Sequence, residues 1–135
     1  MDIGAEKIKL INEHLIEKIA PYLIVLFGSA ASGRMHSGSD IDIAFLSDKD
    51  LSAYEVFMIA QELADILDRD VDLVNLQQAS TVFQAQVVGS GKIIYCSDDN
   101  RRMQFEMLTL KKYARLNEER RCIIEQITRR GSIYE

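Results

Sequence analysis

The segment from Leu23 to Leu46 constrains the fold more than any other part of the chain. It opens with an apolar run that breaks at Gly28-Ser29, continues through a small polar loop, and ends in a run where Asp and Ile alternate before further apolar residues. A continuous apolar run is typical of a strand covered on both faces, and alternation is typical of a strand with one polar face. The segment therefore predicts two strands joined by a loop, the first of them central in a sheet.

The second strand is expected to carry two carboxylates on one face. Because successive side chains on a strand point to opposite faces, Asp40 and Asp42 should project together, while Ile41 and Ile43 project to the other side. Neighbouring carboxylates raise each other's pKa unless a cation lies between them, and carboxylate oxygens suit magnesium, especially with substrate phosphates. The pattern predicts a divalent metal site.

The break after the first strand predicts a phosphate site. Gly28 lets the backbone approach a ligand closely, Ser29 adds a hydroxyl donor, and Ala30-Ala31 favour a short helix whose first N–H groups attract phosphate. Asp-x-Asp alone is a weak signal, and Gly-Ser after a strand is weaker still. The combination is much stronger, with Asp40 eleven positions after Ser29. A phosphate site beside a metal site indicates a nucleoside triphosphate.

Gly-Ser, a spacer and Asp-x-Asp together resemble the signature of the nucleotidyltransferase fold related to DNA polymerase β. The closer resemblance, over roughly Tyr22 to Tyr95, is to the minimal nucleotidyltransferase (MNT) family of HEPN–MNT toxin–antitoxin pairs. That family takes a third carboxylate from a later strand, and Val71–Leu76 offers Asp72 here, with Asp70 the residue most easily confused with it. The resemblance implies catalytic and metal-holding roles for Asp40, Asp42 and Asp72, and nucleotide contacts from Gly28, Ser29, Ser39 and Arg34.

One position departs from the family pattern. Many members carry an arginine before the second glycine of the loop, whereas this chain has Ser32 before Gly33. Arg34 follows directly and is the candidate to reach the phosphates from a shifted position. His36, in the same loop, is expected to be solvated rather than catalytic.

The resemblance also implies an activity. It implies an antitoxin that transfers AMP from ATP to tyrosine hydroxyls of a cognate HEPN RNase toxin, with two magnesium ions as cofactor. Two alternatives stay open, a small-molecule nucleotidyltransferase similar to the aminoglycoside-modifying enzymes and an antitoxin that acts by binding alone. The three carboxylates disfavour binding alone, because clustered acids with no cation to hold destabilise a fold.

The remaining periodicities predict an α/β (α+β) fold with a small mixed sheet flanked by helices. The third strand is expected to run antiparallel to the Asp-x-Asp strand. Residues 98–130 have no internal Gly or Pro and carry apolar residues at helical spacing, which predicts a long C-terminal helix. We divide the chain into a nucleotidyltransferase domain, 1–97, and a helical extension, 98–135, that either packs wholly on this domain or binds a partner. The other elements are expected at 3–20, 52–67 and 77–88 (helices) and 71–76 and 92–96 (strands), with the glycines at 89 and 91 ending the third helix.

Charge and composition bound the partners and the compartment. With 135 residues, 47% of them hydrophobic, the chain is long enough for one domain with a real core. Residues 1–100 hold sixteen acidic and seven basic residues, a charge of −9, whereas residues 101–135 carry +4. The net charge of −5 argues against direct nucleic-acid binding. No segment has the length and hydropathy of a membrane helix or the layout of a signal peptide. The two cysteines, Cys96 and Cys122, are expected to be reduced, packed thiols. Together these features predict a cytoplasmic protein.

Overall fold

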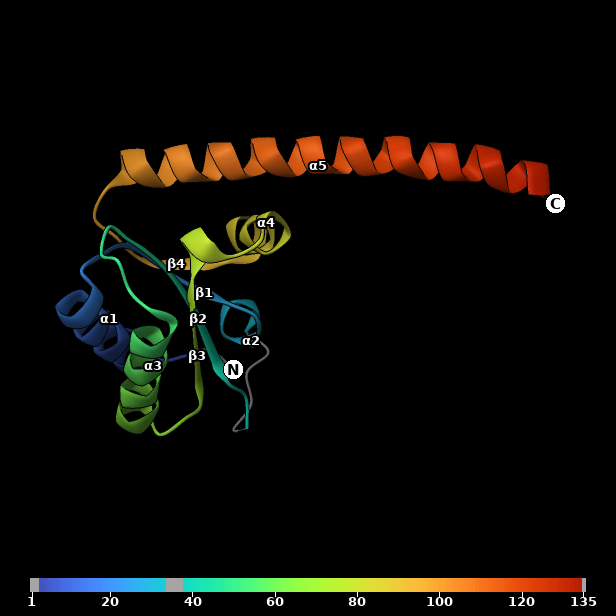
Figure 1. Ribbon diagram of the computed structural model, residues 1–135. Coiled ribbons are helices and arrows are strands. Elements are labelled where there is room, and N and C mark those ends of the chain that lie inside the picture. Colours follow the sequence, from blue (N-terminus) through green and yellow to red (C-terminus); the bar gives the residue numbers. More distant parts are fainter. Residues whose placement is uncertain (1–2, 34–37, 135) are drawn as a thin grey trace.

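A four-stranded sheet with the strand order β3-β2-β1-β4 forms the centre of the computed structural model, which describes residues 3–33 and 38–134 (Figure 1). Helices cover both faces, and a 36-residue helix crosses one side and extends beyond the sheet. In chain order the elements are α1 (Ala5–Ile19), β1 (Pro21–Phe27), α2 (Ser29–Ser32), β2 (Ile41–Ser47), α3 (Ala53–Leu67), β3 (Val71–Asn75), the 3₁₀ turn η1 (Leu76–Gln78), α4 (Thr81–Ser90), β4 (Lys92–Cys96) and α5 (Asp99–Tyr134).

The sheet is mixed, as expected, but one strand runs in the opposite direction to the expectation. β1 is antiparallel to both β2 and β4, whereas β3 is parallel to β2. The antiparallel arrangement predicted for the third strand is therefore wrong. The reason is the connection: α3 lies between β2 and β3, and a strand–helix–strand crossover returns the chain in its original direction.

Each face of the sheet has its own apolar core. On one face, Ile41, Ile43 and Phe45 of β2 pack with buried residues of α1 and α3. On the other face, Ala44 and Leu46 pack with residues of β1, η1 and α4. β1 contributes to both cores, which confirms that the first apolar run is a central strand and explains why it shows no alternation.

Local turn chemistry sets the ends of the helices. α1 ends at Ala20 in a left-handed conformation, with Pro21 opening β1, and Ser52 and Glu55 form a capping box at the start of α3. The expected helix at 77–88 is instead η1 followed by α4, which Ser80 caps.

The helix ends at Gly91, as expected for the glycines that follow it, but Gly91 does not adopt a left-handed conformation. α4 continues through Gly89, and Gly91 has φ −74°, so it is not a left-handed cap. A Cβ at Gly91 would lie 2.5 Å from both Val25 Cγ1 and the Val87 carbonyl oxygen. Gly91 is therefore required by close packing of α4 against β1 rather than by its backbone angle.

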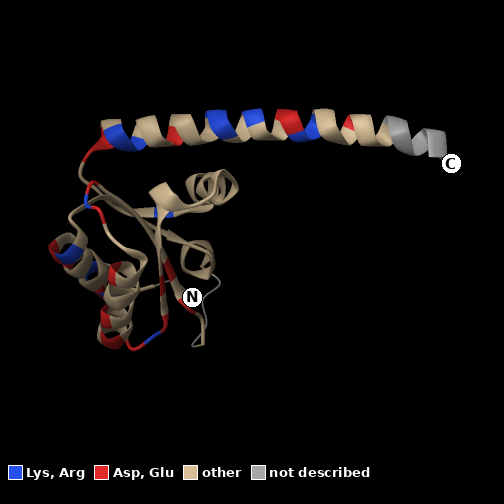
Figure 2. Cartoon of the chain, viewed as in Figure 1, with Lys and Arg blue, Asp and Glu red and all other residues tan. Residues whose placement is uncertain are grey.

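Among the α5 residues up to 128, whose burial the structure describes, those that pack on the rest of the chain lie in the first part of the helix. Thr109 is buried, Phe105 joins the second core and α5 contacts α4, whereas every residue from 117 to 128 is exposed. The alternative in which the whole helix folds against its own sheet is therefore wrong. Lys and Arg are interspersed with Asp and Glu along α5, whereas Asp and Glu predominate on the body of the protein (Figure 2). Cys96 is half-buried but Cys122 lies exposed on α5, so the expected packing holds for one thiol only, and neither forms a disulfide.

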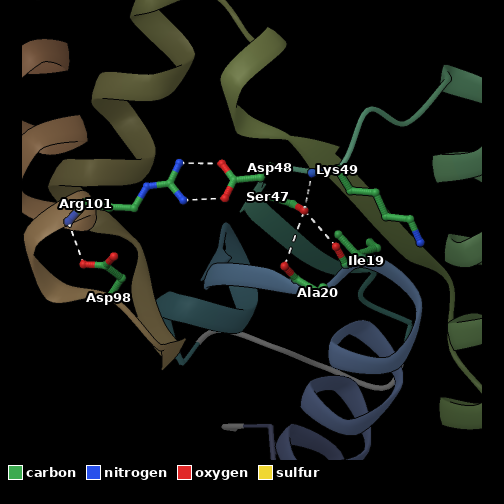
Figure 3. Close-up of polar contacts among 7 residues, drawn as sticks. All are labelled: Ile19, Ala20, Ser47, Asp48, Lys49, Asp98 and Arg101. Carbon is green, nitrogen blue, oxygen red and sulfur yellow. Dashed lines mark hydrogen bonds and ion pairs between the residues drawn. The ribbon is translucent and has the colours of Figure 1, made fainter.

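The start of α5 is fixed to the sheet by a group of polar contacts (Figure 3). Both terminal nitrogens of Arg101 donate to the carboxylate of Asp48, each at 2.6 Å, and the guanidinium stacks 3.9 Å from the centre of the Tyr22 ring. The hydrogen bond from Arg101 lowers the pKa of Asp48. Next to this pair, the Ser47 hydroxyl donates to the Ile19 carbonyl at 2.7 Å and so joins the end of β2 to the end of α1.

Among the helices in the described ranges, none combines the length and hydropathy that a membrane span needs.

Candidate active site

The structure places two of the three predicted carboxylates side by side. Asp42 of β2 and Asp72 of β3 are register partners in adjacent strands, so their side chains project to the same face of the sheet. Asp40 was expected inside the strand but precedes it, because β2 begins at Ile41. Asp40 and Asp72 are exposed, whereas Asp42 is half-buried.

The three carboxylates interact electrostatically. Burial raises the pKa of Asp42, and the charges of Asp72 and then Asp40 raise it further. Asp70 is not among these causes; its backbone carbonyl instead accepts a hydrogen bond from Ile41 N at 2.9 Å. Asp72, and not Asp70, is therefore the neighbour of Asp42, which separates the two residues that the sequence could confuse.

The Gly-Ser turn packs directly on one of these carboxylates, Asp42. Phe27 pairs with Asp42 across β1 and β2, and Gly28 follows with φ +63° and ψ −141°. A Cβ at Gly28 would collide with Asp42 Oδ2, so only glycine fits both the backbone angle and the space. The Gly28 carbonyl accepts from the N–H groups of Ala31 and Ser32, both at 3.2 Å, which begins α2 with Ser29 as its first residue. The two halves of the sequence signature thus form one site.

Arg69 is a residue that the sequence analysis missed. Its Nη2 donates to the Ser39 carbonyl at 3.0 Å, and the Ile41 N–H bonds to the Asp70 carbonyl at 2.9 Å. These two contacts tie the backbone on both sides of Asp40 to the start of β3. Arg69 also lines a cavity of about 460 Å³ and supplies positive charge among its acidic residues, Asp40, Asp65, Asp68 and Asp70. The signal available in the sequence was a single basic residue inside the acidic turn at 68–70.

A cavity of about 590 Å³ opens beside Gly28 and Asp42. Its walls come from the end of β1 and from α4, and they include Phe27 and Phe83, whose rings meet edge-to-face with centroids 5.2 Å apart. This volume falls within the usual range for small-molecule sites, about 300–1,000 Å³. Phe83 was read from the sequence only as a helix residue, because nothing local indicates that α4 returns to the end of β1.

The remaining predicted nucleotide residues do not line this cavity or lie outside the described part. Ser29 is half-buried at the start of α2, and Ser39 precedes Asp40 with its carbonyl bound to Arg69. Arg34, like His36, lies outside the described residues, so the structure does not place it.

The donor chemistry of the site suits a hard divalent cation. Within residues 3–33 and 38–134, no three His, Cys, Asp or Glu side chains already form a metal-ligating cluster. The carboxylates nevertheless interact, since burial first, and then the charges of Asp72 and Asp40, raise the pKa of Asp42. Carboxylate oxygens in this arrangement match the ligands that magnesium prefers, so the residues fit the predicted ion.

Comparisons with known proteins agree with this geometry. The sequence matches the "Polymerase beta, Nucleotidyltransferase" family over residues 7–100. This chain belongs to that family. The nucleotidyltransferase is also 42% identical over 120 residues to the protein adenylyltransferase MntA of Shewanella oneidensis, a match that covers 89% of this chain and 84% of the relative. The resemblance noted in the Gly-Ser and Asp-x-Asp residues is thereby confirmed.

Solved structures confirm the fold of this nucleotidyltransferase. A crystal structure of a toxin–antitoxin with AMP-PNP contains a chain with a TM-score of 0.80 and 39% identity, covering 90% of this chain and 98% of that one. A structure of a tri-AMPylated Shewanella oneidensis HEPN toxin in complex with its MNT antitoxin gives a TM-score of 0.76 and 36% identity, covering 91% and 97%. The mixed sheet with flanking helices and a long C-terminal helix is therefore the fold of this group of nucleotidyltransferases.

Proposed function

We propose that this chain is the antitoxin of a HEPN–MNT pair and transfers AMP from ATP to tyrosine hydroxyls of its cognate HEPN RNase toxin. The observation that carries the proposal is Asp42 paired with Asp72 on one side and packed on Gly28 on the other, in a chain 42% identical to a protein adenylyltransferase. Further support comes from relatives that hold AMP-PNP or accompany a tri-AMPylated HEPN toxin.

The nucleotide would occupy the cavity beside Gly28 and Asp42. Its apolar wall, which includes Phe27 and Phe83, suits the adenosine, and the Gly28 backbone and the Ser29 hydroxyl suit the phosphates. Ser39 and Arg34 are proposed as additional phosphate contacts. Because Gly28 contacts Asp42 so closely, phosphates held at the turn would lie next to the carboxylates.

Asp40, Asp42 and Asp72 would hold magnesium, with two ions expected for this chemistry. When bound, magnesium neutralises the charge that develops on the transferring phosphate and on the leaving group. Arg69 would support this arrangement by fixing the backbone next to Asp40.

The acceptor hydroxyl needs a base. A free tyrosine has a pKa of about 10, so its hydroxyl is protonated at neutral pH. The phenolic oxygen would attack the α-phosphorus of ATP while its proton passes to the Asp72 carboxylate. The bond between the α-phosphorus and the oxygen that bridges to the β-phosphate breaks, and pyrophosphate leaves with the electron pair. The products are AMP-tyrosine and pyrophosphate, and Asp72 then releases its proton to water.

The helical extension, residues 98–135, is proposed to contact the toxin. Exposed apolar side chains occur both within its packed first turns, at Met103 and Met107, and beyond them, at Ile123 and Ile127. Methionine-rich exposed helix faces adapt well to partner surfaces. A cytoplasmic location is part of the proposal, because two unpaired cysteines, one of them exposed, suit a reducing compartment.

The test is intact-mass spectrometry of the HEPN protein encoded by the adjacent gene, after incubation with this chain, ATP and magnesium. We expect a gain of one or more AMP groups with the wild-type chain and none with Asp42→Asn. Asp50→Asn is the matched control, since it makes the same change at an exposed residue beyond the other end of β2 and should leave the gain intact.

Other outcomes would select the alternatives. Absence of any mass gain, together with a stable complex, would replace the proposal with neutralisation by binding alone. Absence of both would favour a small hydroxylated acceptor of the aminoglycoside type. Modification that persists in Asp42→Asn and in Asp40→Asn would refute the metal assignment.

A further inference from the structure

We propose that the acceptor protein docks along the outer edge of β3, so that its tyrosine reaches the active site from the Asp72 side. This inference rests on the proposed function, since it states where the acceptor of that reaction binds. The occupant is an extended, tyrosine-containing segment of the toxin.

A groove of about 460 Å³ follows this edge of the sheet. One wall is α3, which presents Ala53, Val56, Phe57 and Ala60, a spacing that places all four on one face of the helix. The floor is β3 itself, Val71–Asn75, and the opposite wall comes from Gln78 at the end of η1 and from Ala79. The groove thus has an apolar wall on the α3 side and a strand along its length.

β3 is the last strand of the sheet on this side, and its inner edge pairs with β2. In the part of the chain that the structure describes, no strand pairs with its outer edge. The backbone N–H and C=O groups of an open edge are a template for an added strand, and β-strand addition is a common mode of peptide recognition. An extended segment is therefore the chemistry that this groove fits best.

The position of Asp72 connects the groove to the reaction. Asp72 lines the groove, whereas its register partner Asp42 lines the cavity that also contains Gly28. If the nucleotide occupies the Gly28 side, the groove is the remaining approach to the same pair of carboxylates. The two occupants would then meet where β2 and β3 bring Asp42 and Asp72 together.

Strand addition would also orient the acceptor side chain. An added strand lies about 4.8 Å from its neighbour, and directly opposed residues project to the same face of a sheet. A tyrosine opposite Asp72 would therefore project to the face that carries Asp42 and Asp72. Its hydroxyl would lie on the side of the carboxylates rather than on the side of α3.

Phe57 provides the means to test the groove separately from the chemistry. It lines the groove with 57% of its surface exposed, so a docked segment would cover an apolar ring that the core leaves open. Tyr54 lies one turn earlier on α3, is 70% exposed and does not line the groove. Glutamate at either position makes a similar change near the start of the same helix, which makes Tyr54→Glu the matched control.

The experiment measures steady-state AMP transfer to the HEPN protein encoded by the adjacent gene, with saturating ATP and magnesium. For Phe57→Glu we expect the KM for the toxin to rise about tenfold or more, as for loss of an aromatic anchor, with kcat and the KM for ATP within about twofold of wild type. Tyr54→Glu should match the wild-type chain. An unchanged KM in Phe57→Glu, or an equal rise in both variants, would overturn the inference.

Hydrogen exchange supplies a second readout that does not depend on any variant folding. Addition of toxin without ATP should slow exchange of the backbone amides of Val71–Asn75, and unchanged exchange there would overturn docking at this edge. Protection that appears with concentration in the free protein would identify a second copy of this chain as the occupant and would also overturn the inference. A wild-type chain that does not modify the toxin at all would refute the proposed function instead, so the two failures are distinguishable.

Discussion

Replacement of Gly28 by alanine tests whether the Gly-Ser turn and the Asp-x-Asp strand act as one unit. Gly28 has φ +63° and ψ −141°, a region that costs an L-residue about 1–3 kcal/mol. The new methyl group would also collide with Asp42 Oδ2. Displacement of Asp42 from a staggered rotamer adds about 0.5–1.5 kcal/mol. A loss of about 3–5 °C in Tm is expected for each kcal/mol in a chain of this size.

A double-mutant cycle separates the two costs. In an Asp42→Ala background the collision is absent but the backbone angle is unchanged, so Gly28→Ala should cost about 0.5–1.5 kcal/mol less than in the wild-type chain. The free energy of unfolding is measured by urea denaturation in EDTA. Gly89→Ala is the control, since Gly89 lies within α4 with no heavy atom within 4 Å of the added Cβ, and alanine should stabilise the helix by about 0.5–1 kcal/mol.

Two results would refute the reasoning. Equal costs in both backgrounds would mean that the methyl group at position 28 does not meet Asp42. No cost in either background would mean that the positive φ angle is not needed. AMP transfer by Gly28→Ala, measured well below its Tm, should be lost, because the carboxylate displaced by the methyl group is one of the proposed metal ligands.

Two other residues of the site give independent predictions. The raised pKa of Asp42 means that the folded state holds a proton there more tightly than the unfolded state, so ionisation opposes folding. Asp42→Asn should therefore raise the Tm in EDTA at neutral pH. This gain in Tm should disappear as the pH falls below the ordinary aspartate pKa of about 3.9, because Asp42 is then protonated in both states. A gain in Tm that persists in acid would contradict this reasoning. Arg69→Ala should raise the magnesium concentration needed for half-maximal AMP transfer by about tenfold, since a hydrogen bond from a charged donor contributes about 1.5–3 kcal/mol, and Arg69→Lys should recover part of the loss. An unchanged magnesium titration would exclude a positioning role for Arg69.

The parts of the site that lie within one short segment could be predicted from the sequence. Strand alternation placed Asp42 opposite the Ile face, and the break at Gly28-Ser29 predicted the turn, because both are set by neighbouring residues. The family resemblance added Asp72, and the structure places it beside Asp42. The catalytic role of these residues is the part that stays a prediction.

The errors come from relations between elements. The direction of β3 depends on the crossover through α3 and not on the residues of β3, so an isolated strand pattern could not supply it. Asp40 lies before β2 rather than inside it, since the pairing of β2 with β3 begins at Ile41 and Val71. Arg69 and Phe83 were missed for the same reason, because each reaches the site from an element that is distant in the sequence.

The parallel pairing of β2 and β3 has a functional consequence that an antiparallel pairing would not share. Because β2 and β3 are parallel, both strands begin at the end of the sheet where Asp40 and Asp70 lie. Asp42 and Asp72 are therefore register partners, one residue after the first pair of the two strands. β1 ends at this level as well, so Gly28 meets Asp42 from the side opposite β3. Asp42 therefore borders the cavity on the α4 side, and Asp72 borders the open strand edge on the α3 side. In the proposed reaction, a nucleotide and a protein segment would then approach the same carboxylates from opposite directions, and both would be held by one small sheet and its helices.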